Sequence, residues 1–381
     1  MSKKLTAIIA GGGLGGLATA CALAKKGWQV TVYERQSELR ASGSGIYIWE
    51  NGLKVLEALG AYEHAVKGAF RGTHFEQRDN RNQVIESAAI PPDRRLITTE
   101  RSQLLAALRD AALAAGVTIK TRAEVIGATP RGELLFASGE TVRADLAIGA
   151  DGIWSKVRQT LGLELVHDQS LEGALRTMIP AKAGDIPAAD ASKYIENWNG
   201  MRRLLITPVN NTITYLALTC PHTDEKAKNT VIDKALWSAD FPQWAHLIER
   251  IGTEVSWGTY SVIKCRAWSS GRTVILGDAA HAQPPNLGQG GGMAMQNGLA
   301  LATALQDISS QQAIPDALEL WERNERDIVE HCQKWSTLYG EVTFLPDEVR
   351  STVIKSAMAD PWVAGQIFRA ANHPPTGMLN A

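Results

Sequence analysis

The sequence predicts an α/β fold in which a mixed β-sheet is inserted into a parallel-sheet domain and helices form the C-terminal end. Three observations support this fold class. Apolar runs and helical segments alternate at the start of the chain. Helical patterns become sparse between about residues 172 and 262, where strand-like alternation dominates, and two long helical patterns follow.

The first elements form a β-α-β unit. Residues 5–10 are a short apolar run that predicts a buried parallel strand, and residues 28–33 predict a second strand. Between them, residues 15–26 are rich in alanine and leucine and predict a helix that ends before Gly27. This order of elements is typical of a Rossmann-like domain.

Further elements of the same domain follow along the chain. Ser102 is placed to cap a helix over residues 102–115, with Gly116 just beyond its end. Additional strands are expected at 117–122, in a meander over 125–148, at 146–149 and at 272–276. Helices are expected at 296–307 and 316–339, and the residues around His373 are expected to be loosely ordered.

The middle of the chain predicts a separate sheet. Residues 203–207 and 212–218 alternate in polarity, and Asn210 with Asn211 predicts the turn between them. We therefore expect residues 171–262 to form an inserted sheet domain. The expected remainder is a discontinuous domain of residues 1–170 and 263–345, with small β excursions at about 70–100, and a helical tail of residues 346–381.

Composition excludes several classes of partner. The chain has 39 basic and 40 acidic residues, a net charge of -1, which gives no reason to expect nucleic acid or an acidic membrane. Cys21, Cys220, Cys265 and Cys332 form no metal-binding pair and predict buried thiols. With no signal peptide or membrane span in the pattern, we expect a cytoplasmic monomer or homodimer without a metal site.

A glycine motif lies between the first strand and the first helix. Gly11, Gly13 and Gly16 form G-x-G-x-x-G, with Leu14 and Gly15 inside it, where backbone N–H groups at a helix start can bind a pyrophosphate. Glu34 follows the second strand and is placed to accept hydrogen bonds from ribose hydroxyls. The set predicts a dinucleotide site, but it does not distinguish NAD from FAD.

Two later motifs help to distinguish FAD from NAD as the bound dinucleotide. Residues 147–152 end a strand at Asp151-Gly152, and residues 274–281 end another at Gly277-Asp278. Asp278 at a strand end can bind the hydroxyls of a ribityl chain, although each acid taken singly is more often a turn former. A glycine-rich run opens the next helix and offers N–H donors to a flavin edge; it contains Gly288, Gly290, Gly291 and Met293.

Together the three motifs resemble those of the FAD-dependent aromatic hydroxylases, the p-hydroxybenzoate and salicylate hydroxylase superfamily. The resemblance covers the whole chain and implies that the discontinuous domain holds FAD. It implies that the glycine motif and Glu34 hold the ADP half, with Arg35 near the adenosine, and that Asp278 holds the ribityl or pyrophosphate region. It also implies that Asp151 and Arg101 approach the cofactor.

A closer resemblance involves residues 37–53, which look like those of the 2-methyl-3-hydroxypyridine-5-carboxylate oxygenases, pyridine-ring hydroxylases of vitamin B6 breakdown. It implies that Arg203, Tyr215 and Tyr260 hold the substrate. Arg203 can pair with a carboxylate, although a salt bridge within the protein is the competing interpretation. Arg202 beside it allows a register shifted by one residue. His74 or Phe75 stands where a family tyrosine is expected.

Apolar residues near the motifs are expected to exclude water from the site. The candidates are Ile46, Ile48, Trp49, Pro284, Pro285 and Met293. We expect Pro285 to contact the substrate and Tyr47 to contact both substrate and cofactor. His281 lacks a nucleophile partner and is interpreted as structural, so no residue is assigned a certain catalytic role.

The resemblance implies a reaction as well. NADH or NADPH would reduce FAD, O2 would add to give a flavin C4a-hydroperoxide, and a small hydroxylated aromatic or pyridine carboxylic acid would be hydroxylated, with ring opening as a further outcome. Three alternatives remain on the residues alone: an FAD-dependent reductase or dehydrogenase, a plain NAD dehydrogenase, and a non-enzymatic carrier module of the same fold.

Overall fold

The computed structural model describes residues 4–40, 44–253 and 255–378. Its first layer is a six-stranded sheet with the order β18-β19-β12-β1-β2-β8, in which all pairings except β18 with β19 are parallel. The strands are β1 Thr6–Ala10, β2 Gln29–Tyr33, β8 Thr118–Lys120, β12 Leu146–Gly149, β18 Ser269–Ser270 and β19 Thr273–Ile275. The alternation of strand and helix at the chain start therefore forms the predicted Rossmann-like unit.

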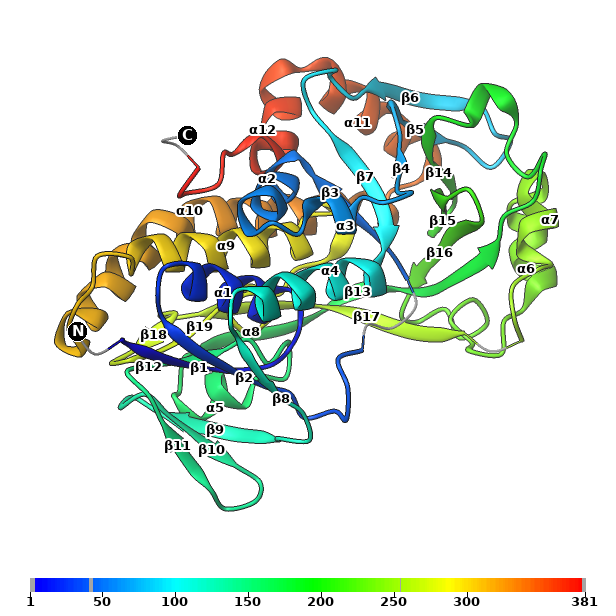
Figure 1. Ribbon diagram of the computed structural model, residues 1–381. Coiled ribbons are helices and arrows are strands. Elements are labelled where there is room, and N and C mark those ends of the chain that lie inside the picture. Colours follow the sequence, from blue (N-terminus) through cyan, green and yellow to red (C-terminus); the bar gives the residue numbers. More distant parts are fainter. Residues whose placement is uncertain (1–3, 41–43, 254, 379–381) are drawn as a thin grey trace.

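Helices cover one face of this sheet, and a small sheet lies on the other (Figure 1). The covering helices are α1 Leu14–Lys25, α4 Arg101–Ala114, α9 Gly290–Ala304 and α10 Ile314–Glu341. On the far side lie α5 Lys156–Thr160 and the strands β9 Val125–Thr129, β10 Glu133–Phe136 and β11 Thr141–Arg143. With both faces covered, the central strand β1 is apolar and buried from Ala7 to Ala10, and Ile9 has no exposed surface.

A seven-stranded sheet forms the second half, with the order β17-β13-β16-β15-β14-β5-β6. Its strands are β5 His74–Arg78, β6 Val84–Ala89, β13 Glu164–Pro180, β14 Lys193–Asn199, β15 Arg202–Asn210, β16 Ile213–Pro221 and β17 Ser256–Cys265. Helices α6 Lys234–Asp240 and α7 Ala245–Ile248 pack against one of its faces, where Trp237, Phe241 and Trp244 are buried (Figure 1). The opposite face is left for a cavity.

Smaller elements connect the two halves. A small antiparallel sheet lies between them, formed by β3 Gly45–Trp49, β4 Phe70–Arg71 and β7 Leu96–Glu100. Helices α2 Glu50–Leu59 and α3 Tyr62–Ala65 follow β3 and precede β4 in the chain. The turn-like helix α8 Asp278–His281 and the 3-10 turn η3 Pro285–Leu287 precede α9. The tail forms α11 Asp347–Ala359, which contacts β6, and α12 Pro361–Asn372, which contacts α2 and α10.

Several expected boundaries differ from the structure. Ser102 is not a helix cap: α4 begins at Arg101, and Glu100 precedes it in extended conformation. Helix α9 begins at Gly290 rather than at residue 296, so glycines of low helix propensity form its first turn, where that low propensity argues against a helix. Strands β5 and β6, expected as excursions of the first domain, complete the seven-stranded sheet.

Strand β13 is the longest of the described strands, at 17 residues, and crosses the expected domain boundary at residue 171. From Glu164 to Gln169 it pairs with β17 alone, and from Glu172 onward it also pairs with β16. The two halves are therefore joined by a continuous antiparallel ribbon. Within the described ranges, no helix is long and apolar enough to cross a membrane.

Candidate active site

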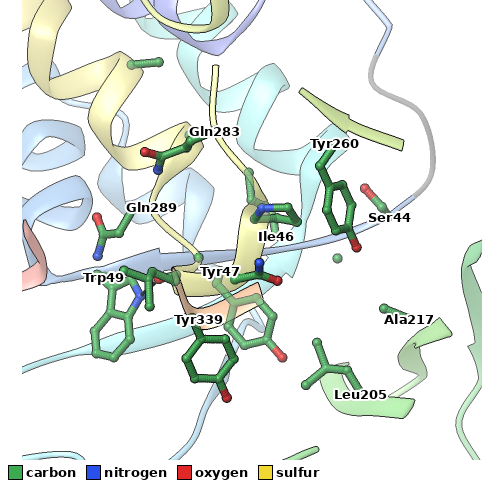
Figure 2. Close-up of a pocket in the computed structure, with 18 of the residues that line it drawn as sticks. Ser44, Ile46, Tyr47, Trp49, Leu205, Ala217, Tyr260, Gln283, Gln289 and Tyr339 are labelled. Atoms are coloured by element: carbon green, nitrogen blue, oxygen red, sulfur yellow. Dashed lines mark hydrogen bonds between the residues drawn. The ribbon is translucent and has the colours of Figure 1, made fainter. Parts of the chain in front are cut away.

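A cavity of about 530 Å³ opens between the carboxyl ends of β1, β12 and β19 and the free face of the seven-stranded sheet. Figure 2 shows Tyr47, Tyr339, Tyr260, Leu205 and Ala217 gathered around this space, with side chains that come from β3, α10, β17, β15 and β16. Ligands of open parallel sheets bind at this position, outside the carboxyl ends of the strands. Each sequence-predicted residue can be located relative to it.

The glycine motif forms one end of the cavity. A Cβ atom at Gly16 would lie 2.1 Å from the carbonyl oxygen of Gly11, so α1 can approach β1 only with glycine here. A Cβ at Gly13, in contrast, would meet no atom within 4 Å. Gly13, Leu14 and Gly15 line the cavity, where the first N–H groups of α1 have no partner within the helix. The loop is therefore open on the side where a pyrophosphate would bind.

Glu34 lies beside this loop, one residue after β2. Its Oε2 accepts a hydrogen bond from the Gly12 N–H at 3.0 Å, and its Oε1 accepts one from the Gln36 N–H at 2.9 Å. The carboxylate is thus held next to the glycine turn with lone pairs to spare for ribose hydroxyls. Arg35 follows it and is exposed.

Asp278 faces into the same space from the end of β19. Its side chain exposes surface to the cavity although it lies deep in the protein, and this burial raises the pKa of its carboxyl group. Arg101, on the first turn of α4, also lines the cavity and acts in the opposite direction on that pKa. An acid that is open to the cavity and that no hydrogen bond from the described residues reaches is suited to the hydroxyls of a polyol ligand.

The second glycine-rich run supplies a helix N-terminus. Gly290 and Gly291 begin α9 and line the cavity, and Gly288 precedes them in a left-handed conformation with a φ of 64°. Met293 differs from this set: it is buried in the core, and its N–H donates to the Gln289 carbonyl at 2.8 Å. The two glycines are therefore the open donors, whereas Met293 does not line the cavity.

Asp151 also lies outside the cavity lining. Its Oδ2 accepts hydrogen bonds from the N–H groups of Lys156 at 2.8 Å and Val157 at 3.2 Å, which satisfies the start of α5. Its neighbours Ala150 and Gly152 do line the cavity. The carboxylate thus has a structural role in the loop, and its cofactor contact stays a prediction.

The far end of the cavity carries an ion-pair network around Arg203. Its Nη1 lies 3.2 Å from Oε1 of Glu196, its Nη2 lies 3.5 Å from Oε1 of Glu172, and the same Nη2 donates to Oδ1 of Asn286 at 2.9 Å. Burial opposes the charge on Arg203, but attraction by the two carboxylates outweighs it and raises the guanidinium pKa. Arg203 lines the cavity as predicted, yet two protein carboxylates already neutralise it.

Glu196 is itself held from the other side. Tyr339 donates its hydroxyl hydrogen to Oε2 of Glu196 at 2.6 Å and accepts one from Nε2 of Gln77 at 2.8 Å. Burial, followed by the charge of Glu196, raises the pKa of Tyr339 well above its usual range, so this hydroxyl stays protonated. Arg203 is therefore matched by two carboxylates, of which Glu196 lines the cavity and Glu172 does not.

Arg176 is a cavity residue that the sequence analysis did not identify. It lies on β13, and its guanidinium carbon is 5.1 Å from the centre of the Tyr260 ring, with Tyr215 as a further neighbour. Among the described residues, no carboxylate forms an ion pair with it. The period-two spacing from Glu172 to Arg176, which puts both on one strand face, was the available signal.

Most of the remaining residues that the sequence analysis named line the cavity, and the others lie outside its wall. Ile46, Tyr47, Trp49 and Pro285 line the cavity, whereas Ile48 is fully buried and Pro284 is absent from the cavity wall. The Tyr47 hydroxyl is hydrogen-bonded to Thr207. At the position of the family tyrosine, Phe75 lines the cavity and His74 does not.

His281 and the four cysteines lie in the core, and the structural role of His281 stays a prediction. The His281 ring packs at a tilted angle against Trp268, with ring centres 5.3 Å apart, and burial lowers its pKa to about 4. The four cysteines are buried free thiols. No group of three or more potential metal ligands occurs in the part of the chain that the structure describes.

A dinucleotide loop, an interior acid and a second helix N-terminus around one cavity define a flavoprotein of the Rossmann-like class. A family model described as an FAD binding domain matches residues 4–336. The chain belongs to this family, within the aromatic hydroxylase superfamily, and is an FAD-dependent monooxygenase; enzymes of this class use NADH or NADPH and O2 as co-substrates.

Three similar proteins show for which substrates or products relatives of this chain are named. A probable 2-heptyl-3-hydroxy-4(1H)-quinolone synthase of Rhodococcus erythropolis is 39% identical and covers 97% of this chain and 97% of its own. The 6-hydroxynicotinate 3-monooxygenase of Pseudomonas fluorescens is 28% identical and covers 88% and 91%. The tetrameric form of 2-methyl-3-hydroxypyridine-5-carboxylic acid oxygenase has a TM-score of 0.87, 33% identity, and coverage of 98% and 97%.

Proposed function

We propose that this monooxygenase hydroxylates a neutral, electron-rich N-heteroaromatic ring of the pyridone or quinolone type. The main support is the pairing of Arg203, which Glu172 and Glu196 already neutralise, so that this guanidinium is not free for a substrate carboxylate. FAD fits the opposite end, where Gly13, Gly290 and Asp278 leave open donors and an unsatisfied acid. When bound, FAD accepts hydride from the nicotinamide and activates O2.

The pairing of Arg203 favours a neutral substrate over a carboxylate at this position. A substrate acid at Arg203 would compete with Glu196 at 3.2 Å and Glu172 at 3.5 Å for the same guanidinium. Like charges in a buried site repel strongly because the surroundings screen them little. Clamping of a substrate acid by Arg203, which the sequence resemblance implies, is therefore less favourable than binding of an uncharged ring beside Glu196.

The Glu196 carboxylate can also accept a hydrogen bond from an N–H group on the substrate ring. Its carboxylate lines the cavity, and a carboxylate has about four acceptor positions, of which the contacts with Arg203 and Tyr339 occupy two. A ring N–H that donates to Glu196 releases more of the nitrogen's electron density into the ring. This makes the carbon next to a ring oxygen more nucleophilic toward an electrophilic oxygen atom.

The names of the relatives support a nitrogen ring as the substrate class. The quinolone synthase, the hydroxynicotinate monooxygenase and the hydroxypyridine oxygenase are all named for nitrogen heterocycles. Ring hydroxylation is the proposed outcome for this chain. Ring opening is the second candidate, favoured only by likeness to the hydroxypyridine oxygenase.

The test is a panel of 4-quinolones, pyridones, hydroxypyridine carboxylates and hydroxybenzoates, assayed for stimulated nicotinamide oxidation under 18O2. We expect the neutral N–H rings to give a product with one labelled oxygen. Ring opening would add the elements of water as well, and a reductase would give no label. Preferred oxygenation of the carboxylates would contradict the proposal.

A matched pair of substrates isolates the role of Glu196. Glu196→Gln should weaken binding of an N–H pyridone by about tenfold, since loss of one charge-assisted hydrogen bond costs about 1.5 kcal/mol. Binding of the N-methyl analogue, which cannot donate, should change little. Equal losses for the two compounds would show that Glu196 does not contact the ring nitrogen.

A further inference from the structure

We infer that the cavity continues into an apolar annex that accommodates a hydrocarbon tail, so that the substrate is an alkyl-substituted N-heteroaromatic ring. The inference rests on the proposed function and deepens it. The annex is formed by residues of β5, β6, α11 and α12, which are Phe75, Ala88, Met358, Ile367, Phe368 and Ala371.

Aromatic side chains organise the wall of the annex. The ring of Trp49 stacks on that of Phe75 with centres 5.6 Å apart and meets the edge of Phe368 at 5.7 Å. Phe75, Ile367, Phe368 and Met358 remain partly exposed even though they line an interior cavity. Apolar surface of this kind gains free energy when a nonpolar group covers it.

The charges near the annex point away from it. Glu76 lies on β5 between Phe75 and Gln77, and its carboxylate is engaged by Arg78 at 2.7 Å and by Lys193 at 2.8 Å. Because successive strand residues face opposite sides of a sheet, the Glu76 side chain leaves β5 on the face opposite to Phe75, although Glu76 also borders the cavity. Its carboxylate is already paired with Arg78 and Lys193, so it offers little to a charged substituent in the annex.

The sheet register connects the annex with the polar edge. Gln77 is the direct neighbour of Glu196 across β5 and β14, and Phe75 is two positions further along β5 and opposite Ala88. Two strand positions span about 7 Å. A ring whose N–H meets Glu196 can therefore place a substituent on the adjacent carbon past Gln77 and over the sheet face that carries Phe75 and Ala88.

The test is a series of 4-quinolones with methyl, butyl and heptyl groups on the carbon next to nitrogen. Binding is measured with the FAD-loaded protein from the change in flavin absorbance, and turnover is measured from oxygenated product. We expect affinity to rise about fourfold per methylene while the annex fills, which corresponds to about 0.8 kcal/mol for each buried group. Equal affinity across the series would overturn the annex.

Two neighbouring alanines provide a variant and its matched control. Ala88 faces the cavity on β6, whereas Ala89 beside it is exposed. Ala88→Leu should weaken heptyl binding at least tenfold without changing methyl binding, and Ala89→Leu should change neither. Loss of heptyl binding in both variants, or in neither, would overturn the assignment.

The design separates failure of the annex from failure of the proposed function. If the rate of oxygenation and the affinity do not depend on the length of the alkyl group, the annex is refuted, but the proposed ring hydroxylation still stands. Binding that strengthens with the tail but gives no oxygenated ring supports the annex and overturns the proposed function. If Ala88→Leu does not fold, the chain-length series on the unchanged protein decides the question.

Discussion

Removal of the Arg203 side chain should destabilise the protein strongly, whatever its effect on substrate. Arg203 is 5% exposed and Glu172 is 2% exposed, and both carboxylate contacts of Arg203 lie within 3.5 Å. Removing one partner of a buried ion pair leaves uncompensated charge and costs about 3–5 kcal/mol. The guanidinium also lies 5.0 Å from the centre of the Trp198 ring, so Arg203→Ala loses this packing too.

The assay is urea unfolding of the FAD-loaded protein, followed by tryptophan fluorescence. Glu172→Gln in the Arg203→Ala background should restore about half of the lost free energy of unfolding, because it removes one of the two stranded charges. A loss below about 1 kcal/mol, the range of exposed pairs, would refute the buried network. So would a double variant that is no more stable than Arg203→Ala alone.

Three further substitutions test the cofactor end and the core. Gly13→Val should leave the fold intact, since its Cβ meets no atom within 4 Å, but the purified protein should lack the yellow flavin absorbance because the branch fills the pyrophosphate space. Asp278→Asn should weaken FAD binding by about tenfold to a hundredfold in titrations of the apoprotein, as expected when hydrogen bonds to a charged group are lost. His281→Gln should reduce the acid sensitivity of the fold: burial lowers the pKa of His281 to about 4, so its neutral ring stabilises the fold fully above pH 6.5, and this contribution is lost as the pH falls to about 4. Parallel urea midpoints of both proteins over that range would contradict the last expectation.

The nucleotide end of the molecule was predictable because its signals are local. A strand, a glycine turn and a helix follow each other within residues 6–25, and Gly16 is required by its close contact with Gly11 inside this segment. Glu34 and Asp278 were identifiable for the same reason, since Glu34 stands directly after β2 and Asp278 stands three residues after the end of β19. Physical requirements confined to a short segment are visible in the segment itself.

The substrate end was less predictable because it depends on distant partners. The sequence indicates a buried arginine at Arg203, but it does not show that Glu172 and Glu196 arrive from two other strands to neutralise it. Arg176 carries no motif, and only the sheet register places it near Tyr260. The annex combines β5 with helices of the C-terminal tail, nearly 300 residues away along the chain.

The ribbon of β13 and β17 limits how such an enzyme can be recombined. Exchange of the substrate sheet between two relatives would cut both long strands, and each new junction would have to preserve the pairing of Arg176 with Ser256 and of Glu164 with Cys265. A splice displaced by a single residue would turn Glu172 and Arg176 away from the cavity. Changes of substrate range in this scaffold are therefore more accessible through single substitutions on the sheet face than through grafting of whole segments.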